Sequence, residues 1–212
     1  MKDLYPGYDV LRKRDTPSWN EQTREAVDER LGMDPERHVF FNDLEWRILR
    51  ALCLRIVPQP EGRDPPIAAM IDEKMAKGAG DGYRHADMPP MREAWRLGLA
   101  ALDDEAQHRY DSPFYMLGGE QQDSVLKHVQ EGEVESPAWT SVPAKEFFST
   151  RILPDIVKSY YSLPCAWNEI GFGGPASPRG YVRMGYDRRD PWEAAEAKPG
   201  REDEARRENA RV

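Results

Sequence analysis

Residues 42–57, NDLEWRILRALCLRIV, decide the fold class of this chain. Apolar residues recur along this stretch at intervals of three and four: Leu44, Ile48, Leu49, Leu52, Cys53 and Ile56. This spacing places them on one face of an α-helix. Asn42 followed by Glu45 is a capping-box pair, and Pro58 cannot continue a helix. The stretch therefore predicts an amphipathic helix that begins after Asn42 and ends at Val57.

The same kind of spacing predicts helices on both sides of this one. They are expected over residues 19–31, 66–78, 90–102, 119–129 and 143–161. Ser18 and Asp64 are the expected caps of the first two, and Pro154 should kink or split the last. No segment alternates apolar and polar residues over the length of a strand. The predicted fold is therefore all-α, an irregular helical domain of about five to six helices with long loops.

Three regions follow from this pattern. Residues 1–37 are predicted to be an N-terminal arm with a weak helix, and residues 38–192 the helical domain. Residues 193–212 carry mixed charges and almost no large apolar side chain. A segment of that composition buries too little apolar surface to fold by itself. We therefore expect a disordered charged tail at 193–212.

Composition excludes several classes of function. The chain of 212 residues has 38 acidic and 30 basic side chains, a formal net charge of −8. An acidic surface argues against non-specific nucleic-acid binding. Cys53 and Cys165 cannot form a disulfide framework or a four-cysteine metal site, although a bridge from Cys165 to a partner stays open. No apolar run reaches the ~18 residues of a membrane helix, so no span is expected.

The stretch most directly linked to function is AWNEIGFGGPASPRGY, residues 166–181. Glycines and prolines shape its backbone, and large aromatic side chains in such a loop must pack against something. It is predicted to be an ordered Gly/Pro/aromatic loop docked either on its own domain or on a partner, and both remain open. The predicted partner contacts are Trp167, Phe172, Arg179 and Tyr181 in this loop, with Tyr5 and Tyr8 of the arm as a second clamp.

Three short motifs contain residue types that could carry chemistry. Residues 81–85, DGYRH, place a carboxylate, a phenol, a guanidinium and an imidazole close together, but show no nucleophile with a matched base. Glu105 and His108 match the Glu-x-x-His pair of diiron helices, yet the partner motif is missing, which favours a solvated surface pair. Residues 171–176 match a dinucleotide-binding turn, but follow a helix instead of a strand. The sequence therefore predicts no catalytic, metal-binding or cofactor-binding residue.

Three blocks of the sequence carry a resemblance to a known family. They are FFNDLEWRILRALCLRIVPQP (40–60), GYRHADMPPMREAWRLGLAALD (82–103) and AWNEIGFGGPASPRGY (166–181). In this order and spacing the chain resembles the gluconate 2-dehydrogenase subunit 3 family over roughly residues 38–192.

The resemblance implies a non-catalytic accessory subunit that supports the folding, maturation or stability of a large flavoprotein. The implied partner is an FAD-dependent dehydrogenase of the glucose–methanol–choline type that oxidises sugars, sugar acids or polyols. Its electrons would pass to a cytochrome or another acceptor. FAD is therefore expected in the partner, and no cofactor in this chain.

Many exported family members carry a twin-arginine signal, which residues 1–15 lack. We therefore expect a cytoplasmic location, or a periplasmic one only if the chain is exported with another subunit. Two alternatives to the accessory role remain: a free-standing enzyme that uses the Asp81–His85 loop, and a helical adaptor without a redox role.

Overall fold

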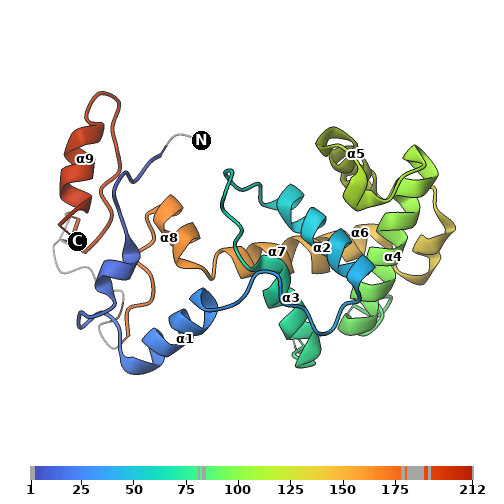
Figure 1. The fold of residues 1–212 in the computed structure, drawn as a ribbon, viewed down its shortest axis with the longest axis horizontal. Coiled ribbons are helices and arrows are strands. Elements are labelled where there is room, and N and C mark those ends of the chain that lie inside the picture. Colours follow the sequence, from blue (N-terminus) through green and yellow to red (C-terminus); the bar gives the residue numbers. More distant parts are fainter. Residues whose placement is uncertain are drawn as a thin grey trace. The chain divides into compact units, whose positions relative to one another are not determined.

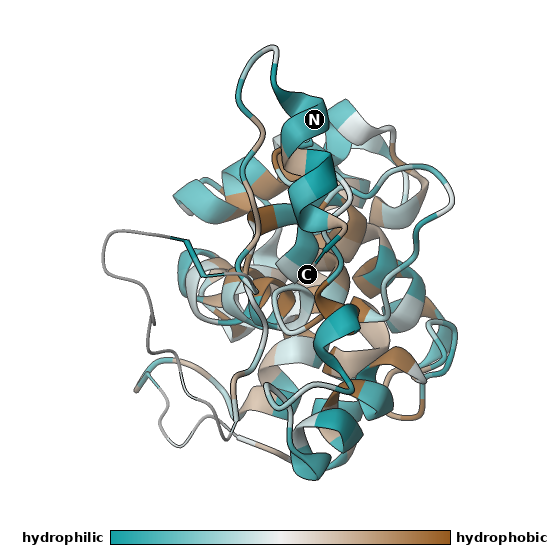
Figure 2. Cartoon of the chain, turned by 90° about the vertical axis from the view of Figure 1, so that its left-hand side faces the viewer, coloured by the Kyte–Doolittle hydropathy of each residue, from teal (hydrophilic) through white to brown (hydrophobic). Residues whose placement is uncertain are grey.

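In a computed structural model, the structure describes residues 3–80, 82, 85–177, 180, 189–190 and 192–211. The described chain is helical and contains no β-strand, which confirms the all-α prediction. Figure 1 labels the α-helices as α1 (Glu21–Leu31), α2 (Asp43–Ile56), α3 (Ile67–Ala76), α4 (Met91–Tyr110), α5 (Gly119–Glu131), α6 (Ala144–Phe147), α7 (Leu153–Tyr160), α8 (Pro164–Ile170) and α9 (Glu202–Asn209). Figure 2 shows hydrophilic and hydrophobic residues mixed along most of these helices, as expected when apolar residues recur every three or four positions.

The chain divides into two compact units. Unit 1 contains Met1–Gly32 together with Tyr161–Val212, and unit 2 contains Met33–Tyr160. The region predicted as one domain, 38–192, thus contributes α2 to α7 to unit 2 and α8 to unit 1. Both ends of the chain belong to unit 1, a long-range pairing that no local pattern encodes.

Helix α2 organises unit 2, as its spacing predicted. It contacts α3, α4, α5 and α7, and it buries Ile48, Leu49 and Leu52. The capping box is present, because the Glu45 N–H donates to Asn42 Oδ1 and the Asn42 N–H donates to Glu45 Oε2, both at 2.9 Å. The predicted apolar face of α2 is not buried along its whole length, since Leu44 in the first turn is 50% exposed.

The proline in the last predicted helix of unit 2 has the expected effect. Helix α6 gives way to a π-helical turn, Phe148–Ile152, and α7 begins at Leu153. Pro154 has no N–H to donate to the carbonyl four residues earlier, so a regular α-helix cannot continue unchanged through this point. The interruption lies directly before Pro154, where the sequence predicted a kink or a split, but it is a π-helical turn through which the helical backbone continues.

Two helix starts differ from the sequence prediction. Helix α1 is capped by Asn20, whose side chain accepts from the Thr23 N–H at 2.9 Å, and the proposed cap Ser18 is buried. Helix α3 follows Pro66, whereas Asp64 binds Arg50 at 2.6 Å. At Asp64 an ion pair with Arg50 takes the residue that the local pattern favoured as a cap, whereas at α1 the cap lies two residues later than predicted.

The C-terminal region contains a helix where the composition predicts disorder. Helix α9 buries Ala205 and Asn209 in unit 1. The Asn209 side chain donates to the Pro6 carbonyl at 3.1 Å and accepts from the Ala195 N–H at 2.6 Å. The Ala197 N–H also donates to the Leu4 carbonyl at 2.7 Å. The C-terminal region buries few apolar side chains, and hydrogen bonds to the N-terminal arm hold it in a folded conformation.

Candidate functional site

The aromatic side chains of the N-terminal arm and of the 166–181 loop meet in unit 1. Tyr8, Val10, Trp19, Val27 and Trp167 form a buried hydrophobic cluster, against which Tyr5 packs as a partly buried residue. The Trp167 indole donates its N–H to the Tyr161 carbonyl at 2.7 Å. Residues 166–170 of this stretch, Trp167 included, belong to helix α8, so the predicted loop begins only at Gly171. The stretch docks on residues of its own chain, one of the two possibilities that the sequence left open.

Hydrogen bonds to backbone groups hold the arm and this stretch in the same arrangement. Asn168 Oδ1 accepts from the Val10 N–H at 2.8 Å, and the Lys13 ammonium donates to the Gly173 carbonyl at 3.2 Å. The Asn20 N–H donates to the Ser177 carbonyl at 2.7 Å, next to an isolated β-bridge between Trp19 and Ser177. These bonds explain why a glycine-rich stretch is ordered.

Two glycines let the loop approach the arm closely. Gly171 and Gly174 have φ values of +66° and +68°, in the left-handed region that favours glycine. A Cβ at position 171 would lie 2.4 Å from the Tyr5 ring, and one at position 174 would lie 2.8 Å from Val10 Cγ2. The tight fit requires glycine at both positions.

This fit makes Gly171→Ala destabilising. The left-handed backbone should cost about 1–2 kcal/mol, and displacement of the partly buried Tyr5 ring about 1 kcal/mol more. The matched control is Gly200→Ala, because Gly200 has φ +77° but a Cβ added there would meet no atom within 4 Å. Urea unfolding of both variants should show a greater loss for Gly171→Ala. Equal losses of unfolding free energy in the two variants would mean that the Tyr5 ring does not pack against Gly171.

The predicted contact residues differ in their exposure. Phe172 is 38% exposed and lies edge-to-face on Trp167, with ring centroids 6.0 Å apart. Trp167 and Tyr8 are buried within unit 1, and Tyr5 is partly buried. Arg179 and Tyr181 lie outside the described residues. A partner-binding role of these six residues stays a prediction, and among the described ones Phe172 is the most accessible.

Tyr8 and Cys53 are buried side chains of types that can transfer protons or act as nucleophiles, and neither is activated. Burial, together with the charge of Asp9, raises the pKa of Tyr8 to about 12, so its phenol is neutral at physiological pH. Burial also raises the pKa of Cys53 far above its usual range, so the reactive thiolate is not populated. Both side chains serve as packing groups.

The loop that the sequence offered as an alternative enzyme site is described only in part. Asp81, Tyr83 and Arg84 lie outside the described residues. His85 is exposed, and its carbonyl accepts from the Met88 N–H at 3.1 Å. The Asp81–His85 hypothesis therefore stays a prediction.

Among the described residues of unit 2, three carboxylates are buried that the sequence pattern did not indicate: Asp72, Glu105 and Asp155. Each occupies a helical position where the spacing calls for an apolar residue, as Asp155 does between Ile152 and Ile156. Asp155 accepts from the Lys74 ammonium and from the Trp95 indole N–H, both at 2.9 Å. An acidic residue at a core position of an amphipathic helix was the sequence feature that could have predicted a buried carboxylate. Asp155 joins α3, α4 and α7 through these two hydrogen bonds.

The interpretation of Glu105 as a solvated surface residue is wrong. Its side chain is fully buried and accepts from Arg109 at 2.6 Å and from the Ser136 N–H at 2.9 Å. The Glu135 N–H donates to it as well, at 3.1 Å. The loop after α5 covers this end of α4, which the helix pattern alone does not indicate.

A cluster of His128, Glu131 and Glu133 places one possible metal-ligand atom from each residue within 4.8 Å of the others. Glu131 and Glu133 are exposed, and acidic groups of this kind often gather on surfaces without an ion. The cluster therefore offers ligand types without the enclosed geometry of a built metal centre.

No helix within the described part of the chain combines the length and the apolar character needed to cross a bilayer. Comparison with known proteins finds a match to a family model described as gluconate 2-dehydrogenase subunit 3, over residues 43–174. This match covers more than half of the chain, from α2 through the docked loop at Gly174. No curated protein and no solved structure matches.

Proposed function

The chain belongs to the gluconate 2-dehydrogenase subunit 3 family, and from this premise we propose that it is a non-catalytic accessory subunit of an FAD-dependent sugar or sugar-acid dehydrogenase. Its partner would be a flavoprotein of the glucose–methanol–choline type that holds the FAD. The chain would bind the folded flavoprotein and help it to mature and remain folded. A cytochrome or another acceptor would take the electrons.

The observation that carries the binding step is the exposed aromatic side chain of Phe172. It projects from a loop that Asn168, Gly171 and Trp167 hold in place. Its neighbour Ile170 is 49% exposed. A rigid aromatic group beside an aliphatic one is typical of the few residues that dominate binding energy at interfaces. Because the loop is already ordered, little conformational entropy is lost on binding.

Stabilisation of the flavoprotein follows from mass action. A subunit that binds the folded flavoprotein and not its unfolded chain shifts the folding equilibrium of its partner. At a free concentration 100 times the dissociation constant, the shift is about 2.7 kcal/mol. An accessory subunit can thus raise the yield of active enzyme without touching the substrate.

Affinity purification of the tagged full chain from its native host tests the proposal. We expect a stoichiometric yellow complex, with flavin absorbance and a flavoprotein of the glucose–methanol–choline type identified by mass spectrometry. Removing the subunit from the purified complex should lower the thermal stability of the flavoprotein. A colourless chain that purifies alone and well folded would contradict the proposal.

Phe172→Ala should raise the dissociation constant of this complex by about tenfold, the loss typical of a moderate interface hot spot. Its circular dichroism spectrum and melting temperature should stay close to those of the wild type, because the ring is partly solvated and not enclosed in the core. Leu31→Ala is the control, since Leu31 is an exposed apolar residue of α1 in the same unit. An unfolded Phe172→Ala chain would instead assign the ring to the core.

A further inference from the structure

Two arginines of α4 lie on one aromatic ring at the surface of unit 2. The guanidinium carbons of Arg92 and Arg96 are 4.8 and 4.5 Å from the centroid of the Phe40 ring. Arg96 also donates to the Phe40 carbonyl at 2.8 Å. Val39, the preceding residue, is 65% exposed. We call these four residues, Val39, Phe40, Arg92 and Arg96, the Phe40 surface.

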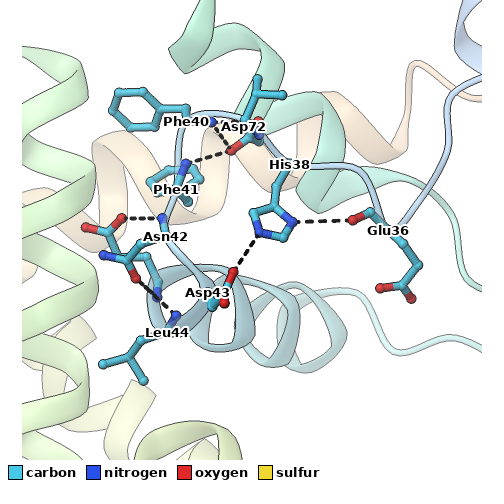
Figure 3. Close-up of polar contacts among 10 residues, drawn as sticks. Glu36, His38, Phe40, Phe41, Asn42, Asp43, Leu44 and Asp72 are labelled. Carbon is cyan, nitrogen blue, oxygen red and sulfur yellow. Dashed lines mark hydrogen bonds and ion pairs between the residues drawn. The ribbon is translucent and has the colours of Figure 1, made fainter.

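A buried carboxylate holds the backbone of this surface in place. Asp72 accepts from the N–H groups of Val39 at 2.7 Å, Phe40 at 3.0 Å and Phe41 at 2.9 Å. Figure 3 shows the Asp72 carboxylate facing the N–H groups of Phe40 and Phe41. Phe41 is buried and lies edge-on to Trp95, with ring centroids 6.4 Å apart. An exposed segment thus has a rigid base in the core.

The segment is also fixed on its N-terminal side. The His38 ring stacks on Trp46 at 4.6 Å between centroids, and its Nε2 lies 3.4 Å from Asp43 Oδ1 (Figure 3). Burying a charge costs free energy unless the charge is well hydrogen-bonded. The buried Asp72 carboxylate accepts from three backbone N–H groups, and these bonds fix the backbone conformation of residues 39–41. Preorganisation of this kind lowers the entropy lost on binding.

The two arginines keep most of their donors available. A guanidinium has five N–H donors, and in the described chain the Phe40 carbonyl is the hydrogen-bond acceptor recorded for this pair. Neither arginine forms an ion pair with a described carboxylate, although Glu93 lies between them in sequence. Elsewhere in this acidic chain arginines do bind carboxylates, as Arg55 binds Asp123. The cation–π contacts orient Arg92 and Arg96 without using the N–H groups that grip a carboxylate.

We propose that the Phe40 surface is a docking site for a carboxylate-bearing segment of the flavoprotein subunit. This inference rests on the proposed function and names a second contact beyond the Phe172 loop. Charge complementarity selects the partner, because two oriented guanidiniums match aspartate or glutamate side chains in bidentate geometry. Val39 and the Phe40 ring supply the apolar contact beside them, so the arginines would be partly shielded from water when the partner binds.

Binding of the purified full chain to the purified flavoprotein tests this inference. Arg92→Glu/Arg96→Glu should raise the dissociation constant by about 30-fold in about 0.1 M NaCl, since like charges would then face each other. The effect should shrink in about 1 M NaCl, where the Debye length falls from about 10 to about 3 Å. Arg92→Lys/Arg96→Lys keeps the charge and loses the planar fork, so a weakening of about fivefold is expected.

The control is Arg207→Glu/Arg211→Glu, which makes the same charge change at two exposed arginines of unit 1. It should alter the dissociation constant by less than about twofold, and all variants should keep the wild-type melting temperature. Wild-type affinity of the Arg92/Arg96 reversal at low salt would overturn the docking site alone. So would a wild-type chain that self-associates through this surface and becomes monomeric on reversal. A wild-type chain that binds no flavoprotein would overturn both proposals.

Discussion

Replacing Glu105 by alanine is expected to destabilise unit 2 by about 3–5 kcal/mol, the usual result of breaking a buried ion pair from one side. Arg109, whose side chain is 14% exposed, would lose its closest carboxylate. The N–H groups of Glu135 and Ser136 would lose their acceptor at the same time. Urea unfolding at pH 7 measures the loss. A cost below about 1 kcal/mol would mean that water reaches this end of α4 freely.

Glu105→Gln separates the charge from the hydrogen bonds, since the amide oxygen can still accept. Burial raises the pKa of Glu105, but the hydrogen bonds from Ser136, Arg109 and Glu135 outweigh it and hold the pKa below the ordinary value of 4.5. A lowered folded-state pKa means that the charge stabilises the fold fully above pH 4.5 and ceases to do so as the pH falls through the folded-state pKa. The stability difference between the wild type and Glu105→Gln should therefore be constant near neutral pH and shrink in acid. A difference that grows in acid would contradict the lowered pKa.

Gly98→Ala should destabilise the same unit by about 3 kcal/mol, although alanine normally stabilises a helix interior by about 0.5–1 kcal/mol. A Cβ at position 98 of α4 would lie 2.2 Å from Phe147 Cζ. The Phe147 ring is fully buried between Trp95 and Trp139, at centroid distances of 5.5 and 6.3 Å. Because Trp95 and Trp139 are themselves buried, the Phe147 ring cannot move aside without displacing other core side chains, and overpacking of a close-packed core is costly.

Two variants test this explanation of Gly98. Gly119→Ala is the control, because the Cβ there would meet only the end of the flexible Arg55 side chain, and we expect a change within about 0.5 kcal/mol. Gly98→Ala/Phe147→Leu removes part of the ring, so the double variant should lose less than the sum of its two single losses. Additive losses would show that the methyl group and the ring do not collide.

Much of the fold could be predicted because its causes are local. The cap at Asn42, the period of α2 and the missing N–H of Pro154 act within one or two turns of helix, and the structure bears out each. The cap expected at Asp64 failed because Arg50 binds its carboxylate, and the cap of α1 is Asn20, whose N–H is held by the carbonyl of the distant Ser177, instead of Ser18. The predicted site was likewise identified in part from local sequence and decided in part by distant contacts. The aromatic loop was identified from its composition, but its burial against Tyr8 and Val10 depends on residues some 160 positions away.

The sequence by itself determined an acidic, all-α chain, its family, the positions of its main helices and the docked Gly/Pro/aromatic stretch, although α4 continues to Tyr110, past the predicted end at 102. Helix periodicity, proline geometry and short motifs depend on neighbouring residues, which is why these features could be predicted. Only the tertiary structure decided that both chain ends build unit 1, that the charged C-terminal region is helical, and that Asp72, Glu105 and Asp155 lie inside unit 2. These outcomes depend on which distant donors reach each buried acceptor. An isolated carboxylate or a weak helix has no stable conformation until such partners supply the hydrogen bonds that replace water.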